Sequence, residues 1–179
     1  MSILKYVNLA ATPIDSHKTK RILIVDDEPR LRAGYAQLLA QDGRSIEECA
    51  TGLAAQARLN KRDIDVVVLD LNLPDISGIE IMHWMQINHL DTSVVVFSAD
   101  ESIDSAILAL RQGAFEFIRK TCDPDDLMSA VARALRRRQV EQEHVTMSAH
   151  MEQSERLHRF LVEQSPDIIY TLDNEGHFV

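Results

Sequence analysis

The sequence predicts an α/β domain with a five-stranded parallel sheet and helices on both of its faces. Short apolar runs alternate with amphipathic segments, which is the pattern of buried strands separated by helices. Four of these runs cover residues 22–25, 66–69, 94–97 and 115–118. The segment 45–50 carries two glutamates among its apolar residues, which suits a strand at the edge of the sheet. The resulting order, βαβαβαβαβα, is typical of a doubly wound parallel sheet.

Segments with helical spacing of apolar residues lie between the predicted strands, and Gly43, Pro74, Gly78 and Gly113 mark turns at their boundaries. The apolar positions at helical spacing are Leu31, Tyr35, Leu38 and Leu39; Ala54, Ala57 and Leu59; Ile79, Ile81, Met82 and Met85; Ile103, Ile107 and Leu110. Residues 125–163 contain neither glycine nor proline and are rich in Ala, Leu, Arg, Glu and Gln. This composition predicts one long helix or two closely joined helices.

The composition describes an acidic chain with material for one ordinary core. Its 179 residues are 45% hydrophobic, and its formal net charge of −9 argues against nucleic acid or an anionic membrane as a partner. A local basic cluster is interpreted as a solvated helix face: Arg133, Arg136, Arg137 and Arg138. Cys49 and Cys122 match no metal or redox spacing, and no run approaches the roughly 18 apolar residues of a membrane span. We therefore expect a cytoplasmic protein, with a flexible leader at residues 1–19.

The second half of the long helix, residues 138–163, carries a thin apolar seam and is expected to be a linker. The seam follows alternating spacings of three and four residues: Val140, His144, Met147, Met151, Ser154, His158 and Leu161. This pattern favours a coiled coil and a homodimer through the seam, in which Val140, Met147, Met151 and Leu161 would meet their counterparts. A solvated connector is the alternative, because only those four positions are apolar.

Residues 164–179 predict a strand, a turn at Asp-Asn-Glu-Gly and the beginning of a second strand. A lone two-stranded ribbon is marginally stable in water, so we expect these residues to open a domain whose remainder lies outside this sequence.

Polar residues follow the predicted strands at the point where each strand ends. Asp26 and Asp27 follow the first, Asp70 the third, Ser98 the fourth and Lys120 the fifth. Parallel strands bring these residues to one edge of the sheet, where open α/β folds bind ligands. Three carboxylates there would repel one another unless a cation lay among them, and Mg²⁺ prefers such oxygen ligands. Asp70 would then be an ionised nucleophile, with Lys120 and the Ser98 hydroxyl available to phosphoryl oxygens.

Each of these residues also has an ordinary interpretation. Asp27 could cap the helix that Pro29 opens, Asp70 could cap a turn, Ser98 could cap the helix near residue 102, and Lys120 could be a surface lysine. Their joint occurrence at one sheet edge favours the functional interpretation.

Four stretches resemble the receiver domains of two-component response regulators: IVDDEP (24–29), DLNLPDISG (70–78), Ser98-Ala99 and FEFIRK (115–120). The resemblance covers about residues 20–135 and implies a domain at residues 20–137 with a flavodoxin-like sheet of order 2-1-3-4-5 and an extended C-terminal helix. It implies that Asp70 accepts a phosphoryl group from a histidine kinase or phosphotransfer protein, in contact with Ser98, Ala99 and Lys120. It also implies that Asp27, Asp70 and the carbonyl of Asn72 bind Mg²⁺, with Asp26 contributing through water.

By the same resemblance, Ser98 and Phe117 act as the switch. The Ser98 hydroxyl would move toward the phosphate, the Phe117 ring would turn inward, and the surface formed by the fourth helix, fifth strand and fifth helix would change. That surface is a second place where a homodimer could form. The family usually has proline after the lysine, whereas this sequence has Thr121, which leaves a cis bond at that position open.

The tail, RFLVEQSPDIIYTLDNEGHFV, resembles the opening of a PAS sensory domain. In such architectures a receiver passes its state through a helix to PAS and then to an output, often a cyclic-di-GMP enzyme or a histidine kinase.

Two other functions compete with a switch. A phosphatase of the haloacid-dehalogenase type also uses an aspartate nucleophile, Mg²⁺ and a lysine, but it needs an acidic residue two positions after the nucleophile, where this chain has Asn72. The third possibility is a dimerisation module that is never phosphorylated.

Overall fold

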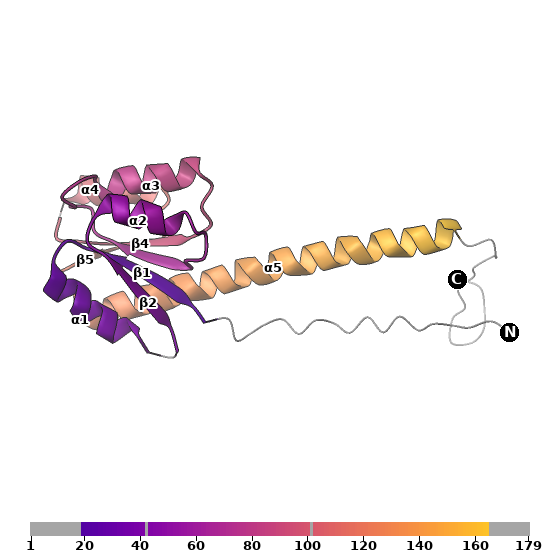
Figure 1. Ribbon diagram of the computed structural model, residues 1–179, viewed down its shortest axis with the longest axis horizontal. Coiled ribbons are helices and arrows are strands. Elements are labelled where there is room, and N and C mark those ends of the chain that lie inside the picture. The colour runs from indigo at the N-terminus through magenta and orange to yellow at the C-terminus, as the bar shows by residue number, and fades with distance from the viewer. Residues whose placement is uncertain (1–18, 42, 101, 165–179) are drawn as a thin grey trace. The chain divides into compact units, whose positions relative to one another are not determined.

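The computed structural model describes residues 19–41, 43–100 and 102–164, and it contains a parallel sheet of five strands (Figure 1). The strand order β2-β1-β3-β4-β5 confirms the predicted fold class. All strand pairs are parallel, so the carboxyl ends of the strands share one edge of the sheet and the amino ends share the other. The elements are β1 (Arg21–Val25), α1 (Pro29–Leu39), β2 (Ser45–Cys49), α2 (Gly52–Leu59), β3 (Val66–Leu69), α3 (Gly78–Ile87), β4 (Ser93–Ser98), α4 (Ile103–Arg111), β5 (Glu116–Arg119) and α5 (Pro124–Gln164).

Helices cover both faces of the sheet because its central strands are apolar on both sides. Successive side chains of a strand point to opposite faces. In β1, Leu23 and Val25 pack in a core with α2, α3 and α4, whereas Ile22 and Ile24 pack with α1 and the first turns of α5 (Figure 1). The sheet therefore separates two apolar cores.

The observed strands differ from the predicted ones by at most one residue at each end. The clearest difference is β5, which begins at Glu116 although the apolar run begins at Phe115. The Phe115 N–H still donates to the Val94 carbonyl at 2.7 Å, so this residue continues the hydrogen bonding outside the strand proper.

β2 is the edge strand that its two glutamates predict. It pairs with β1, and each glutamate forms an ion pair with a helix, Glu47 with Arg58 of α2 and Glu48 with Arg32 of α1. Charged side chains on an edge strand discourage pairing with a further strand.

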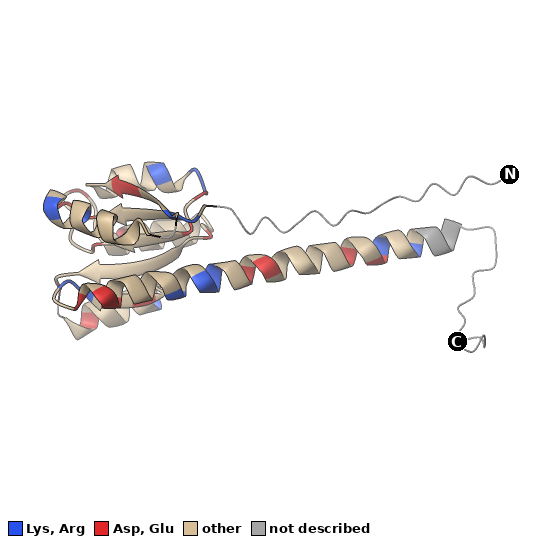
Figure 2. Cartoon of the chain, turned by 90° about the horizontal axis from the view of Figure 1, so that it is seen from below, with Lys and Arg blue, Asp and Glu red and all other residues tan. Residues whose placement is uncertain are grey.

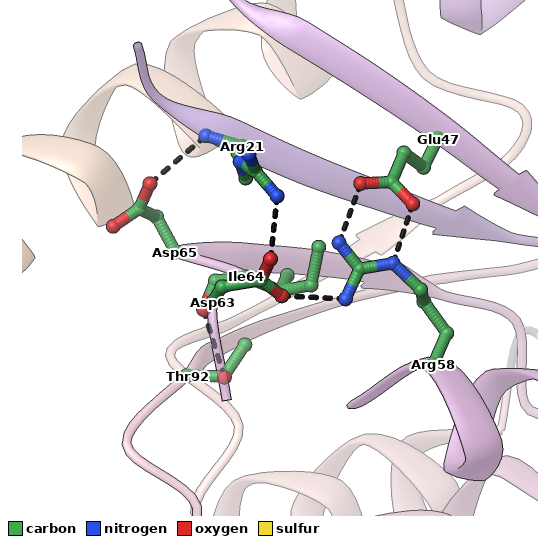
Figure 3. Close-up of polar contacts among 7 residues, drawn as sticks. All are labelled: Arg21, Glu47, Arg58, Asp63, Ile64, Asp65 and Thr92. Carbon is green, nitrogen blue, oxygen red and sulfur yellow. Dashed lines mark hydrogen bonds and ion pairs between the residues drawn. The ribbon is translucent and has the colours of Figure 1, made fainter. Parts of the chain in front are cut away.

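A chain of alternating charges joins α2 to the amino ends of the strands (Figure 3). Arg58 of α2 donates to both carboxylate oxygens of Glu47 and to Asp63, and Asp63 also pairs with Arg21 at the start of β1. Hydrogen bonds from Arg58 lower the pKa of Glu47 and of Asp63, and the bonds with Glu47 and Asp63 raise the pKa of Arg58. We call Arg21, Glu47, Arg58 and Asp63 the amino-edge cluster. Each carboxylate in it faces a guanidinium.

The chain divides into two units, the first ending at Leu135 and the second beginning at Arg136. In the first unit, the opening turns of α5 bury Leu127, Ala130, Val131 and Ala134. In the second, residues 136–160 carry charges of both signs along the helix (Figure 2). Several large apolar residues there are exposed: Val140, Val145, Met147, Met151, Leu157 and Phe160.

The predicted leader at residues 1–19 and the predicted PAS segment at 164–179 lie outside the described residues, except for Thr19 and Gln164. The side chain of the seam residue Leu161 lies outside them as well. None of the described helices combines the length and the apolar character that a membrane span requires.

Candidate functional site

Three carboxylates meet at the carboxyl ends of β1 and β3, two neighbouring strands in the interior of the sheet. Val25 and Leu69 are register partners, so the residues that follow them are neighbours, and the Asp70 N–H donates to the Val25 carbonyl at 2.9 Å. One carboxylate oxygen from each of Asp26, Asp27 and Asp70 lies within 4.8 Å of the others. Asp26 and Asp70 are buried, with 3% and 4% of their surface exposed, whereas Asp27 is exposed. We call these three residues the acidic cluster.

Lys120 reaches this cluster from the segment that follows β5. Its Nζ lies 2.6 Å from Asp70 Oδ2 and 2.8 Å from Asp26 Oδ2. Burial alone lowers the pKa of Lys120, but its hydrogen bonds with Asp26 and Asp70 outweigh burial and leave that pKa above its ordinary value. Lys120 therefore carries its positive charge and faces two buried carboxylates.

Main-chain groups hold the carboxylates in place. The N–H of Glu28 donates to Asp26 Oδ1 at 2.9 Å, and the N–H of Asn72 donates to Asp70 Oδ1 at 3.2 Å. Arg32 of α1 donates to the main-chain carbonyl of Asp26 at 2.7 Å and pairs with Glu48. Asn72 thus lies beside Asp70 through its main-chain N–H, while Arg32 is a neighbour that the sequence did not predict.

Ser98 is fully buried at the end of β4, and its carbonyl accepts the Lys120 N–H at 2.9 Å, so the sheet brings both residues to the same edge. Its Oγ accepts the N–H of Asp100 at 3.3 Å, and Ala99 is exposed between them. Phe117 is half-buried in β5 and lines a groove of about 550 Å³ formed by α4, β5 and the start of α5. The Lys120–Thr121 bond is trans, as are the other described peptide bonds.

Two of the ordinary interpretations fail. Glu28, not Asp27, is the N-cap residue of α1, and it makes no side-chain cap. Ser102 is the N-cap residue of α4, and its N–H bonds to the Asp100 carboxylate rather than to Ser98. The Asp100 carboxylate also accepts from the Ser105 hydroxyl at 2.5 Å. An aspartate shortly before a helix is a known capping signal. The Ala-Asp-Glu-Ser run could therefore have predicted that Asp100 accepts hydrogen bonds at the start of α4.

This strand order, with three carboxylates and a lysine at the carboxyl edge of the sheet, defines the flavodoxin-like receiver class of α/β proteins. Residues 22–132 match the family described as the response regulator receiver domain, and the chain belongs to that family. Receiver domains are signalling modules, so membership overturns the haloacid-dehalogenase alternative.

Several known proteins similar to this chain are named as regulators. The luminescence regulatory protein LuxO of Vibrio campbellii is 35% identical over 114 residues, which are 64% of this chain and 25% of LuxO. The nitrate/nitrite response regulator NarL of Escherichia coli K12 is 33% identical over 115 residues, covering 63% of this chain and 53% of NarL. A solved signal receiver domain of a LuxO repressor protein from Vibrio parahaemolyticus has a TM-score of 0.67 and 31% identity, covering 70% of this chain and 96% of that one. This chain therefore spans a quarter to a half of these two regulators.

The acidic cluster fits Mg²⁺, which receiver domains bind at such a group of aspartates. Its donors are carboxylate oxygens, the ligand type that Mg²⁺ prefers. Among the described side chains, Lys120 is the cation paired with these carboxylates, so three negative charges face one ammonium. A divalent cation would compensate the remaining charge.

Proposed function

We propose that this chain is a phosphorylation switch in which Asp70 accepts a phosphoryl group from a histidine kinase or a phosphotransfer protein. The observation that carries the proposal is the position of Lys120 Nζ, 2.6 Å from a buried Asp70 carboxylate that lies beside Asp26 and Asp27. Membership in the receiver family supports the same role.

In this proposal, a few residues at the carboxyl edge have separate roles in phosphoryl transfer. Asp26, Asp27, Asp70 and the carbonyl of Asn72 would hold Mg²⁺, which when bound offsets the charge of Asp70 and of the incoming phosphoryl group. One oxygen of Asp70 attacks phosphorus, the phosphorus–nitrogen bond of the donor phosphohistidine breaks, and the donor imidazole leaves. Lys120 transfers its contact from the carboxylate to a phosphoryl oxygen, which keeps the new charge paired.

The response to phosphorylation would begin at Ser98. Its hydroxyl turns toward the phosphoryl group, to which Ala99 adds a further contact, and the N–H of Asp100 loses its present acceptor. The ring of Phe117 turns inward and changes the groove between α4, β5 and α5. That groove has apolar walls from Ile103, Ile107 and Leu110, which makes it a possible dimer surface.

We further propose that the state of the receiver is relayed along α5 to an output beyond residue 163. The seam would pair two chains in parallel, and its described members Val140, Met147 and Met151 are exposed, which supports this role. The output would begin with a PAS domain at residues 164–179 and continue to an enzyme such as a cyclic-di-GMP enzyme or a histidine kinase.

Phosphorylation is tested with acetyl phosphate and Mg²⁺, followed by intact mass measurement. The wild type should gain one phosphoryl group per chain in a linkage stable to acid and labile to base, and Asp70→Asn should gain none. Asp104→Asn, which neutralises an exposed aspartate in the first turn of α4, is the matched control and should behave as wild type. Modification of Asp70→Asn to the wild-type extent would overturn the proposal.

The relay is tested by cross-linking a cysteine placed on the seam. Met147→Cys, in a chain with Cys49→Ser and Cys122→Ser, should give a cross-linked dimer whose yield changes on phosphorylation. Ala149→Cys lies off the seam on the same helix and should give little product. Identical Met147→Cys yields with and without phosphate would instead favour the dimerisation module, for which replacing Asp70 or Lys120 has no effect on the dimer.

A further inference from the structure

The segment between β3 and α3, residues 70–77, carries one proposed Mg²⁺ ligand that is a main-chain atom rather than a side-chain atom. This ligand is the main-chain carbonyl of Asn72, whose own side chain is exposed. The position of a carbonyl depends on the path of the backbone, so the contacts that hold this β3–α3 loop determine where the ligand lies.

The base of the loop closes directly beside Asp70. The N–H of Gly78 donates to the carbonyl of Leu71 at 2.9 Å. A Cβ atom at Gly78 would lie 2.4 Å from the Asp70 carbonyl oxygen and 2.8 Å from the Leu71 Cα, so only glycine permits this approach. The two ends of the loop are therefore fixed to each other.

The far side of the loop is fixed to a different element, helix α2. Asp75 Oδ1 accepts the N–H of Gly52 and Asp75 Oδ2 accepts the N–H of Leu53, each at 2.8 Å. These are the first two residues of α2, whose N–H groups have no partner within the helix. The hydrogen bonds from Leu53 and Gly52 lower the pKa of Asp75 to about 2, so its carboxylate is ionised throughout the neutral range.

A second contact joins the same two elements. The side chain of Ile76 lies against Gly52, where a Cβ atom would come within 2.3 Å of Ile76 Cγ1. Gly52 is buried, so the loop covers the beginning of α2 through two consecutive residues, one polar and one apolar.

Helix α2 is itself a firm support. Ala55 and Leu59 are buried in the core, and Arg58 joins the other end of the helix to Glu47 and Asp63 of the amino-edge cluster (Figure 3). A contact to the beginning of α2 therefore restrains the loop against the body of the domain.

We propose that Asp75 is a positioning residue for the Mg²⁺ site, because it fastens the loop that presents the Asn72 carbonyl to the beginning of α2. The inference rests on the proposed function, in which Mg²⁺ supports phosphoryl transfer to Asp70. Asp75 itself does not touch the metal in this account.

The test compares two substitutions that each remove a cap from the same helix. Asp75→Ala removes the bonds to Gly52 and Leu53, and Thr51→Ala removes the bond that Thr51 Oγ1 accepts from the Ala54 N–H at 3.2 Å, without touching the loop. Calorimetric titration of the full chain with MgCl₂ should show Mg²⁺ affinity about tenfold weaker for Asp75→Ala. Thr51→Ala should remain within about twofold of wild type, since it leaves the loop fastened.

Two further measurements distinguish an effect on the position of the β3–α3 loop from an effect on the stability of α2. Amide hydrogen exchange without metal should be faster at residues 71–77 in Asp75→Ala and unchanged there in Thr51→Ala. Phosphorylation of Asp75→Ala by acetyl phosphate should be slow at low Mg²⁺ and return to the wild-type rate at saturating Mg²⁺. Asp75→Asn keeps one acceptor oxygen and should give an intermediate affinity.

Wild-type Mg²⁺ affinity in Asp75→Ala would overturn this inference alone, provided the wild type binds Mg²⁺ and is phosphorylated. Equal weakening in Asp75→Ala and Thr51→Ala would also overturn it, because both would then act through the stability of α2. A wild type that binds no Mg²⁺ would overturn the inference together with the proposed function.

Discussion

Charged clusters lie at both edges of the sheet, but positive and negative charges are balanced in only one of them. At the amino edge, Glu47 and Asp63 alternate with Arg58 and Arg21, and each carboxylate is paired with a guanidinium. At the carboxyl edge, Asp26, Asp27 and Asp70 lie close together, and among the described side chains Lys120 pairs with Asp26 and Asp70. Balanced charges stabilise a fold, whereas an excess of buried negative charge costs stability and creates a place for a cation.

Helix α2 contacts both regions of the domain. Its last turn carries Arg58 of the amino-edge cluster, and its first turn receives Asp75 from the loop beside the acidic cluster. One short helix therefore links the amino-edge cluster to the loop beside the acidic cluster.

The largest effect is expected from Lys120→Gln. Without the ammonium, Asp26 and Asp70 stay buried with no paired cation, so the free energy of unfolding in metal-free buffer should fall by about 3 kcal/mol. The rate of phosphorylation by acetyl phosphate should fall on the order of 100-fold, because Lys120 no longer stabilises the phosphoryl oxygens. Urea unfolding and intact mass measure the two effects.

The matched control for that substitution is Lys61→Gln. Lys61 is exposed, so its replacement should change the unfolding free energy by less than about 0.5 kcal/mol and leave phosphorylation unchanged. If both lysine variants had the same unfolding free energy and the same rate of phosphorylation, Lys120 would have no special role beside the acidic cluster.

Arg58→Ala should affect stability without affecting chemistry. Glu47 and Asp63 lose their shared donor, and because both are about one-third exposed, the expected loss is only about 1–2 kcal/mol in the free energy of unfolding. Phosphorylation at saturating Mg²⁺ should keep the wild-type rate. Arg30→Ala, an exposed arginine in α1, is the control, and its unfolding free energy should match wild type. A large loss of phosphorylation in a folded Arg58→Ala would contradict the separation of the edges.

A smaller effect is expected from pH. The pKa values of Glu47 and Asp63 are lower in the folded protein than in the unfolded chain because of their bonds with Arg58. Their contribution to stability is therefore complete above the unfolded pKa values, near about 4, and is lost as pH falls through the lower folded values. Urea unfolding between pH 7 and pH 3 measures it, and Glu47→Gln should flatten part of that dependence. An unchanged profile in Glu47→Gln would assign the acid sensitivity to other carboxylates.

Residue patterns predicted a parallel sheet of five strands and the members of the acidic cluster, whereas the strand order was implied by the resemblance to receiver domains. The sheet and the cluster depend on patterns that are local, such as the buried run Val66–Leu69, or on the rule that parallel strands end at one edge. The contacts that support the two clusters were not predictable in this way. Asp75 and Gly52 are 23 positions apart, and Arg21 and Asp63 are 42 apart, so no periodicity relates them. Arg32 likewise donates to a main-chain carbonyl. Because every residue has such a carbonyl, the residue types alone do not predict this contact.

If the carboxyl edge holds excess negative charge for a cation, the free energy of unfolding must depend on the Mg²⁺ concentration, and urea unfolding at a series of Mg²⁺ concentrations measures this dependence. Above the dissociation constant, the wild type should gain about 1.4 kcal/mol for each tenfold rise in free Mg²⁺. Asp70→Asn should gain much less, and in metal-free buffer it should be at least as stable as wild type because one repelling charge is gone. A wild type that does not respond to Mg²⁺, or an Asp70→Asn variant that responds equally, would contradict the account.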